Sequence, residues 1–149
     1  MKTIMKIFQT GFLILGINAI SFTSFSQTDN FKLSDLKGKT WNMQGLTDKT
    51  DEANYDNNKL IHTLTDITKT KYVFTFEYYL CDSIVKIFDS TKVGTIMEGK
   101  YIVTRVLRDN KTNPTQPQPV SVYEIVELNS TKLVIRNIKQ QNLIEYKIR

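Results

Sequence analysis

The sequence predicts an all-β protein, in which an antiparallel up-and-down meander of eight or nine strands closes into a barrel. From residue 59 onward, apolar and polar residues alternate with a period of two in one segment after another. Short polar turns separate these segments, and no segment after residue 38 has the apolar spacing of a long amphipathic helix. Strands joined by short turns pair with their neighbours, and closure removes the exposed edges. A β-sandwich is the alternative.

The N-terminus has the three parts of a secretory signal peptide, over residues 1–26. Two lysines begin it, an apolar run over 12–20 follows, and Ser24 and Ser26 place small residues before a cut at Gln27. The apolar run is shorter than the roughly 20 residues that span a bilayer, which favours cleavage over a retained anchor. We therefore expect an exported protein, periplasmic or secreted, with no membrane span after cleavage.

Residues 27–149 are enough for one domain of ordinary size, and we expect a single barrel domain over that range. The formal net charge of +5 comes without long runs of lysine or arginine, which argues against nucleic acid as a partner. Cys81 is the only cysteine, so a disulfide within the chain is excluded. We expect it to be a buried side chain, with a bridge to a second chain as the alternative.

A short helix is expected just before the first strand. Phe31, Leu33 and Leu36 are spaced for one helical face, and Ser34 is a possible N-terminal cap. Gly38 follows the last of them, at the place where a left-handed residue commonly ends a helix.

The strands are expected at 39–47, 59–65, 71–79, 82–88, 92–97, 100–107, 120–128, 132–138 and 142–148. The segment 71–79 has the clearest alternation, because Tyr72, Phe74, Phe76 and Tyr78 share one face.

Two longer segments are expected to be loops. Residues 48–58 are polar and hold four acids, but they lack the glycine and the closing glutamate of a calcium loop. Residues 108–119 hold all three prolines, Pro114, Pro117 and Pro119, and proline cannot donate to a strand ladder.

Five short motifs, spread over most of the mature chain, carry a resemblance. They are Leu36-Lys37-Gly38-Lys39-Thr40-Trp41, Phe74 with Phe76, Gly99-Lys100-Tyr101-x-Val103, Tyr123-Glu124-Ile125-Val126-Glu127-Leu128 and Lys132-Leu133-Val134-Ile135. Together they resemble the small exported lipocalin-like proteins of bacteria. The resemblance implies a lipocalin-like barrel with Trp41 packed across its closed end. The spacing from Gly38 to Trp41 is one residue longer than the Gly-x-Trp of lipocalins.

The resemblance implies that Phe74 and Phe76 point into the barrel, and alternation then places Tyr72 and Tyr78 on the same face. The expected ligand pocket comprises Trp41, Tyr72, Phe74, Phe76, Tyr78, Tyr101, Arg105 and Tyr123. An aromatic interior with one cation suits a small amphipathic acid, whose carboxylate would pair with Arg105 or else with Arg136. The alternative is a solid core with Arg105 at the rim.

Catalytic chemistry has few residues to use. His62 is the only histidine, so a cluster of histidine ligands for a metal is impossible, and one cysteine excludes a zinc framework. No strained nucleophile turn and no glycine-rich phosphate loop is present. We expect no enzyme, cofactor or metal, and a structural place for His62 at the surface or rim of a strand.

Two functions remain open. The first is binding of a small hydrophobic or amphipathic molecule inside the barrel. The second is a protein-interaction module of the cell envelope, in which the barrel is a scaffold and loops 48–58 and 108–119 recognise the partner.

Overall fold

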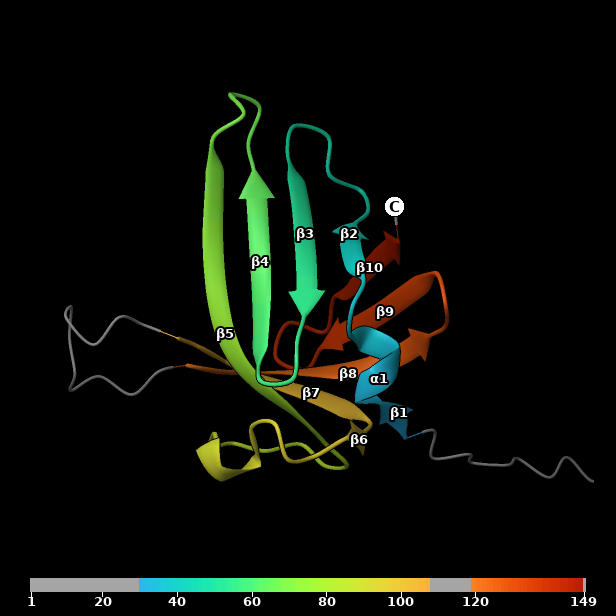
Figure 1. Ribbon diagram of the computed structural model, residues 1–149. Coiled ribbons are helices and arrows are strands. Elements are labelled where there is room, and N and C mark those ends of the chain that lie inside the picture. Colours follow the sequence, from blue (N-terminus) through green and yellow to red (C-terminus); the bar gives the residue numbers. More distant parts are fainter. Residues whose placement is uncertain (1–29, 108–118, 149) are drawn as a thin grey trace, which may run out of the picture.

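Eight antiparallel strands close into a barrel in the computed structural model, which describes residues 30–107 and 119–148 (Figure 1). The barrel strands are β2 (Thr40–Met43), β3 (Thr50–Tyr55), β4 (Lys59–Thr65), β5 (Lys71–Cys81), β7 (Tyr101–Val106), β8 (Val120–Leu128), β9 (Lys132–Asn137) and β10 (Leu143–Ile148). Each pairs with the next barrel strand along the chain, and β10 pairs with β2. The predicted meander and its closure are confirmed, and the β-sandwich is excluded. The expected signal peptide and nearly all of the loop 108–119 lie outside the described residues.

The remaining elements are short. They are β1 (Phe31–Lys32), α1 (Leu33–Leu36), the 3-10 helix η1 (Ser90–Lys92) and β6 (Glu98–Gly99). β1 and β6 form a separate two-stranded ribbon, in which Phe31 is paired with Gly99 and Lys32 with Glu98. No helix in the described ranges is long and apolar enough to cross a membrane.

The segment before the first barrel strand covers one end of the barrel, near α1 in Figure 1. α1 confirms the expected short helix, and Gly38 follows it with a left-handed φ of 69°. Ser34 is not its cap: the N-cap position is Lys32, which makes no capping bond through its side chain. Trp41 is fully buried, and its Nε1 donates to the carbonyl oxygen of Leu36 at 2.9 Å. Trp41 is therefore packed at this end of the barrel, in contact with the last residue of α1.

The expected loop 48–58 is wrong, because most of it is β3. This strand pairs with β2 on one side and β4 on the other, which satisfies its backbone in spite of its polar composition. Asp51, Ala53 and Tyr55 face the barrel interior, in alternation with outward side chains. The expected first strand, 39–47, correspondingly ends at Met43.

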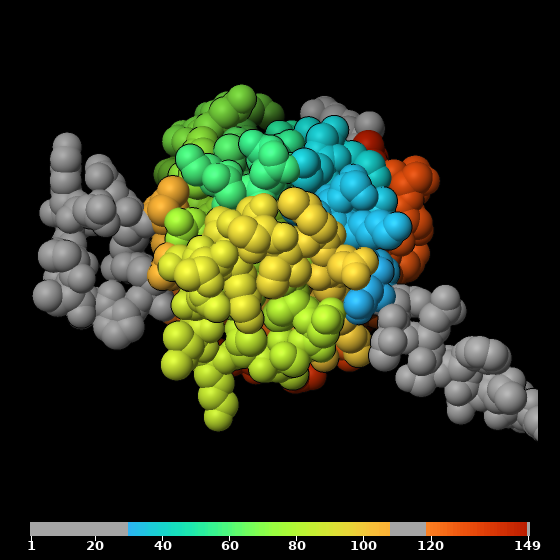
Figure 2. Space-filling model, turned by 60° about the horizontal axis from the view of Figure 1, so that its bottom comes forward, coloured from blue at the N-terminus to red at the C-terminus, as the bar shows by residue number. Residues whose placement is uncertain are grey.

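The two strands expected at 82–88 and 92–97 are also wrong. β5 continues to Cys81, and the chain then forms turns and η1 before β6. In Figure 2 this segment, in yellow-green and yellow, spreads across one end of the molecule beside the blue N-terminal residues. Phe88 packs on the outer face of the barrel against Tyr79 and Val103. The apolar residues of this segment therefore belong to a second, external core and do not form strands. Cys81 is buried there, as expected.

Candidate functional site

A cavity of about 220 Å³ lies inside the barrel, and every barrel strand contributes to its wall. Its lining comprises Met43, Asp51, Tyr55, Leu60, His62, Phe76, Ile102, Thr104, Tyr123, Ile135, Ile144 and Tyr146. Strand alternation explains the set, because lining residues on one strand are separated by an even number of positions. The cavity is thus built by the closed sheet itself and not by loops.

Asp51 and His62 form a hydrogen bond in this cavity, with Oδ1 of Asp51 2.9 Å from Nδ1 of His62. They come from neighbouring strands, since β3 pairs with β4. Their side chains are 17% and 19% exposed, so the pair is largely removed from water but still within reach of a small solute. When Asp51 is ionised it only accepts, so Nδ1 carries the proton and Nε2 presents a lone pair. No described residue hydrogen-bonds to that Nε2.

Hydroxyl groups line the same cavity. Tyr55 and Tyr146 are at most 5% exposed, and the buried Thr104 is 4% exposed. Within the described part of the chain their hydroxyls have no hydrogen-bond partner, in contrast to Tyr78, which donates to the carbonyl of Asp56. Buried polar groups are nearly always paired, so these hydroxyls indicate a place for water or for a ligand's polar atoms.

Burial raises the pKa of Tyr55 well above its usual value, and the other tyrosines and Asp51 raise it further. Burial also raises the pKa of Tyr146, with a second contribution from the charge of Asp51. Both phenols therefore stay protonated at neutral pH and can donate a hydrogen bond.

The rest of the wall is apolar and orders the imidazole. The ring of His62 meets Phe76 edge-on at a centroid distance of 5.5 Å and Tyr146 at 6.5 Å. Leucine, isoleucine and methionine side chains complete the wall. No lysine or arginine is among the lining residues, so Asp51 and His62 are the ionisable groups beside the phenols.

Four of the expected pocket residues lie in the barrel interior. Phe76 and Tyr123 line the cavity. Trp41 and Tyr78 are buried in the core cluster that α1 covers, so they fill the closed end and do not line the cavity.

Tyr72 and Phe74 lie beyond the cavity, on the part of β5 that pairs only with β4 within the described residues. Phe74 is the cross-strand neighbour of His62, and Tyr72 that of Leu64, so both have the inward register. Their exposed fractions are 47% and 46%, because the strands β3, β4 and β5 project past the rest of the barrel there (Figure 1). They belong to the rim.

Tyr101 and Arg105 lie on the outer face, which corrects their expected place in the pocket. Ile102 and Thr104 take the inward positions of β7, so alternation turns the odd-numbered side chains outward. Nη2 of Arg105 pairs with Oε2 of Glu77 at 2.5 Å, and its guanidinium lies 4.3 Å from the ring centre of Phe88.

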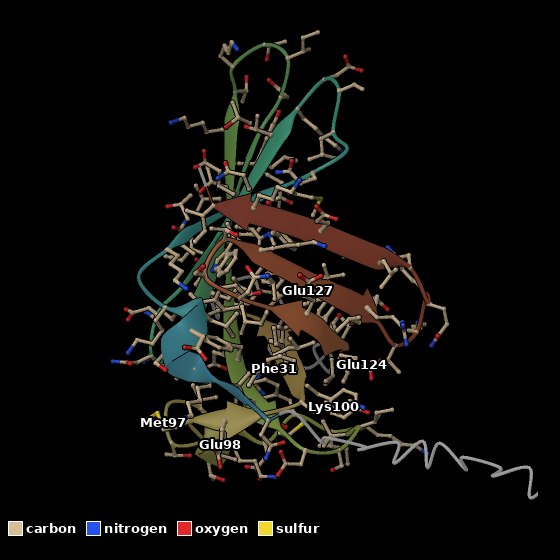
Figure 3. All side chains as sticks on the ribbon, turned by 90° about the vertical axis from the view of Figure 1, so that its right-hand side faces the viewer. Phe31, Met97, Glu98, Lys100, Glu124 and Glu127 are labelled. Carbon is tan, nitrogen blue, oxygen red and sulfur yellow. The ribbon has the colours of Figure 1, made fainter. Side chains whose placement is uncertain are left out.

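The alternative cation, Arg136, is also outside, on the outer face of β9. Its Nη1 lies 3.1 Å from Oε2 of Glu124, which also pairs with Lys100 at 3.0 Å. Figure 3 labels Lys100 and Glu124 on this surface.

The sequence reasoning missed the two central polar residues. His62 lines the cavity instead of lying at the surface or rim of its strand, and Asp51 lies on β3, where the sequence predicts a loop. The alternation of Leu60, His62 and Leu64 was the available signal, because it places the histidine on the apolar face of its strand. Nothing comparable marks Asp51, whose neighbours are also polar.

Comparisons with protein-family models, curated proteins and solved structures found no match to this chain. Any functional conclusion therefore has to come from the cavity.

Proposed function

We propose that the protein is an exported, lipocalin-like binding protein that holds one small, uncharged molecule inside its barrel. The observation that carries the proposal is the set of unpaired buried hydroxyls, on Tyr55, Thr104 and Tyr146, around a cavity with apolar walls. Ligand sites commonly combine apolar lining with a few convergent polar groups that set orientation. Export is supported by the signal-like residues 1–26.

The volume restricts the size of the ligand. An engineered apolar cavity of about 150 Å³ holds benzene, and this cavity measures about 220 Å³. Drug-sized ligands occupy pockets of roughly 300–1,000 Å³. A single substituted ring or a compact branched chain fits, whereas a long acyl chain does not.

The charges restrict its chemistry. Among the described residues, no cation other than a protonated His62 faces the cavity, and the carboxylate of Asp51 disfavours a buried anion. Arg105 cannot pair with a bound acid, because it lies on the outer face with Glu77. A neutral molecule with a carbonyl or hydroxyl oxygen as acceptor therefore suits the site better than a carboxylic acid.

A panel of single-ring ketones, phenols and carboxylic acids, measured by ligand-observed NMR and thermal shift, tests the proposal. We expect neutral ring compounds to bind and acids to bind more weakly. Tyr146→Phe keeps the ring but removes the hydroxyl, and should weaken binding roughly tenfold.

Two outer-face variants, Tyr101→Phe and Arg105→Gln, are the matched controls, and both should bind as the unaltered protein does. Binding that is insensitive to Tyr146→Phe but lost in Arg105→Gln would overturn the proposal in favour of an acid held at the outer face. No binding across the panel would also count against it.

A second candidate is a protein-interaction surface at a different place from the expected loops 48–58 and 108–119. It consists of exposed apolar side chains at the projecting ends of β4 and β5. Val73 is 62% exposed and Ile67 is 72% exposed, next to Tyr72 and Phe74 at the rim. Large exposed apolar groups in one place can mark a contact surface. A Val73→Lys change should abolish capture of an envelope protein and leave ligand binding unaltered if this alternative holds.

A further inference from the structure

We propose that Asp51 and His62 act as a proton-transfer pair on a carbonyl compound bound in the cavity, so that the barrel catalyses keto–enol or double-bond isomerisation. This inference rests on the proposed binding function and adds a chemical step to it. His62 would be the catalytic base, and Asp51 its positioning residue.

The hydrogen bond to Asp51 fixes the orientation of the His62 imidazole. The bond from Nδ1 of His62 to Oδ1 of Asp51, at 2.9 Å, selects the tautomer whose Nε2 lone pair is free. A carboxylate that accepts a hydrogen bond from Nδ1 of a histidine also stabilises the imidazolium that forms when Nε2 takes up a proton.

The sheet and the neighbouring rings also hold His62 in place. Its strand, β4, is paired on both sides, with β3 and with β5. Edge-on contacts with Phe76 and Tyr146 limit rotation of the ring. A general base must be held within hydrogen-bonding distance of the proton that it removes.

The cavity also holds hydroxyl donors for the negative charge that develops during the step. Removal of a proton beside a carbonyl leaves negative charge on the carbonyl oxygen, and preorganised donors in a site shielded from water stabilise it. Tyr55 and Tyr146 are buried phenols without a partner among the described residues. Thr104 offers a third such hydroxyl on β7.

The step balances without any further reactant. Nε2 of His62 takes a proton from the carbon next to the carbonyl, and the electron pair of that C–H bond forms the enolate or dienolate. The imidazolium then returns the proton to a carbon further along or to the oxygen. The product is an isomer of the substrate.

Cyclohex-3-en-1-one is a suitable probe, because it is a single ring with a carbonyl and its isomerisation to cyclohex-2-en-1-one is visible in the ultraviolet. The purified protein should accelerate this isomerisation above the buffer rate. His62→Gln should lower kcat by about 10²-fold or more, as loss of a general base does.

The positioning role of Asp51 has its own readout. Asp51→Asn should lower kcat with little change in KM, and Asp51→Glu should recover part of the loss. Tyr146→Phe should lower kcat/KM, whereas the outer-face variant Tyr101→Phe should leave the kinetics unchanged. Circular dichroism of each variant checks that it is folded.

Binding of the product, measured by NMR, separates the two proposals. Binding without acceleration, or equal rates for the unaltered protein and folded His62→Gln, overturns the catalytic inference and leaves the binding function standing. Absence of binding by this ring and by indan-1-one overturns the inference together with the proposed class of ligand.

Discussion

At the residue scale, a few side chains each satisfy a specific need of the fold. Trp41 fills the closed end and supplies the hydrogen bond that the last turn of α1 lacks, through Nε1 and the carbonyl of Leu36. Tyr78 does the same for the turn after β3, by donating to the carbonyl of Asp56. Tyr55 and Tyr146 differ because their hydroxyls have no such target in the described residues, which is why they are candidates for ligand contact.

Trp41→Phe tests the closed end. The change removes the indole N–H, leaves a carbonyl without a partner and opens a small void, so we expect a loss of about 2 kcal/mol in the free energy of unfolding. Urea denaturation followed by circular dichroism measures it. Tyr101→Phe, on the outer face, is the control and should change stability by less than about 0.5 kcal/mol. A loss for Trp41→Phe as small as the control's would mean that Trp41 does not hold this end.

At the element scale, a barrel strand carries apolar side chains on both of its faces where another segment of the chain covers its outer face. Val103 is fully buried although it faces outward, because Phe88 and the segment after β5 lie over it. At the end of β5, the backbone of β6 approaches the backbone of β5 closely. A Cβ on Gly99 would lie 2.5 Å from the backbone nitrogen of Cys81, closer than side-chain carbons approach backbone.

Two glycines should therefore respond differently to substitution. Gly99→Ala forces backbone apart and should cost about 2–3 kcal/mol of stability. Gly38 has open space around it but a φ of 69°, so Gly38→Ala should cost about 1–2 kcal/mol through backbone strain alone.

The asparagine variants distinguish the two causes in the same denaturation assay. Asparagine tolerates left-handed backbone, so Gly38→Asn should recover most of the stability, whereas Gly99→Asn should not. Recovery at both positions would contradict the close approach of β6 to Cys81.

At the scale of the whole molecule, the interior is a mixed core of aliphatic side chains and tyrosines. Burial raises the pKa of Tyr55, Tyr78 and Tyr146 above the value that each has in the unfolded chain. The folded protein consequently holds these protons more tightly than the unfolded chain. Their contribution to stability is complete below the unfolded pKa and is lost as the pH rises through the folded values.

Alkaline titration tests this property. We expect stability to fall above about pH 10, the ordinary pKa of tyrosine. Exposed tyrosines should ionise first, and the buried ones only together with unfolding, as seen by tyrosinate absorbance and circular dichroism. Ionisation of all tyrosines while the circular dichroism stays native would contradict the buried positions.

The sequence by itself determined the class and the closure of the fold. Period-two alternation and short turns leave few arrangements other than a meander, and the open edges of a meander favour closure. The turn at Gly38 also followed from the local sequence, whereas the burial of Trp41 was expected only from the resemblance to lipocalin-like proteins. The strand β3 did not, because its acids and asparagines hide an alternation that only pairing with β2 and β4 stabilises.

Only the tertiary structure decided which face of each strand became the interior. On β7 both faces carry apolar residues, so the sequence could not tell that Ile102 and Thr104 turn inward while Arg105 turns out. The same holds for the candidate site. Asp51 and His62 are eleven positions apart and meet because the β3–β4 register brings them to one face of the sheet, which no local pattern specifies. Local alternation thus determined where most of the strands lie, and long-range pairing determined which side chains meet inside the barrel.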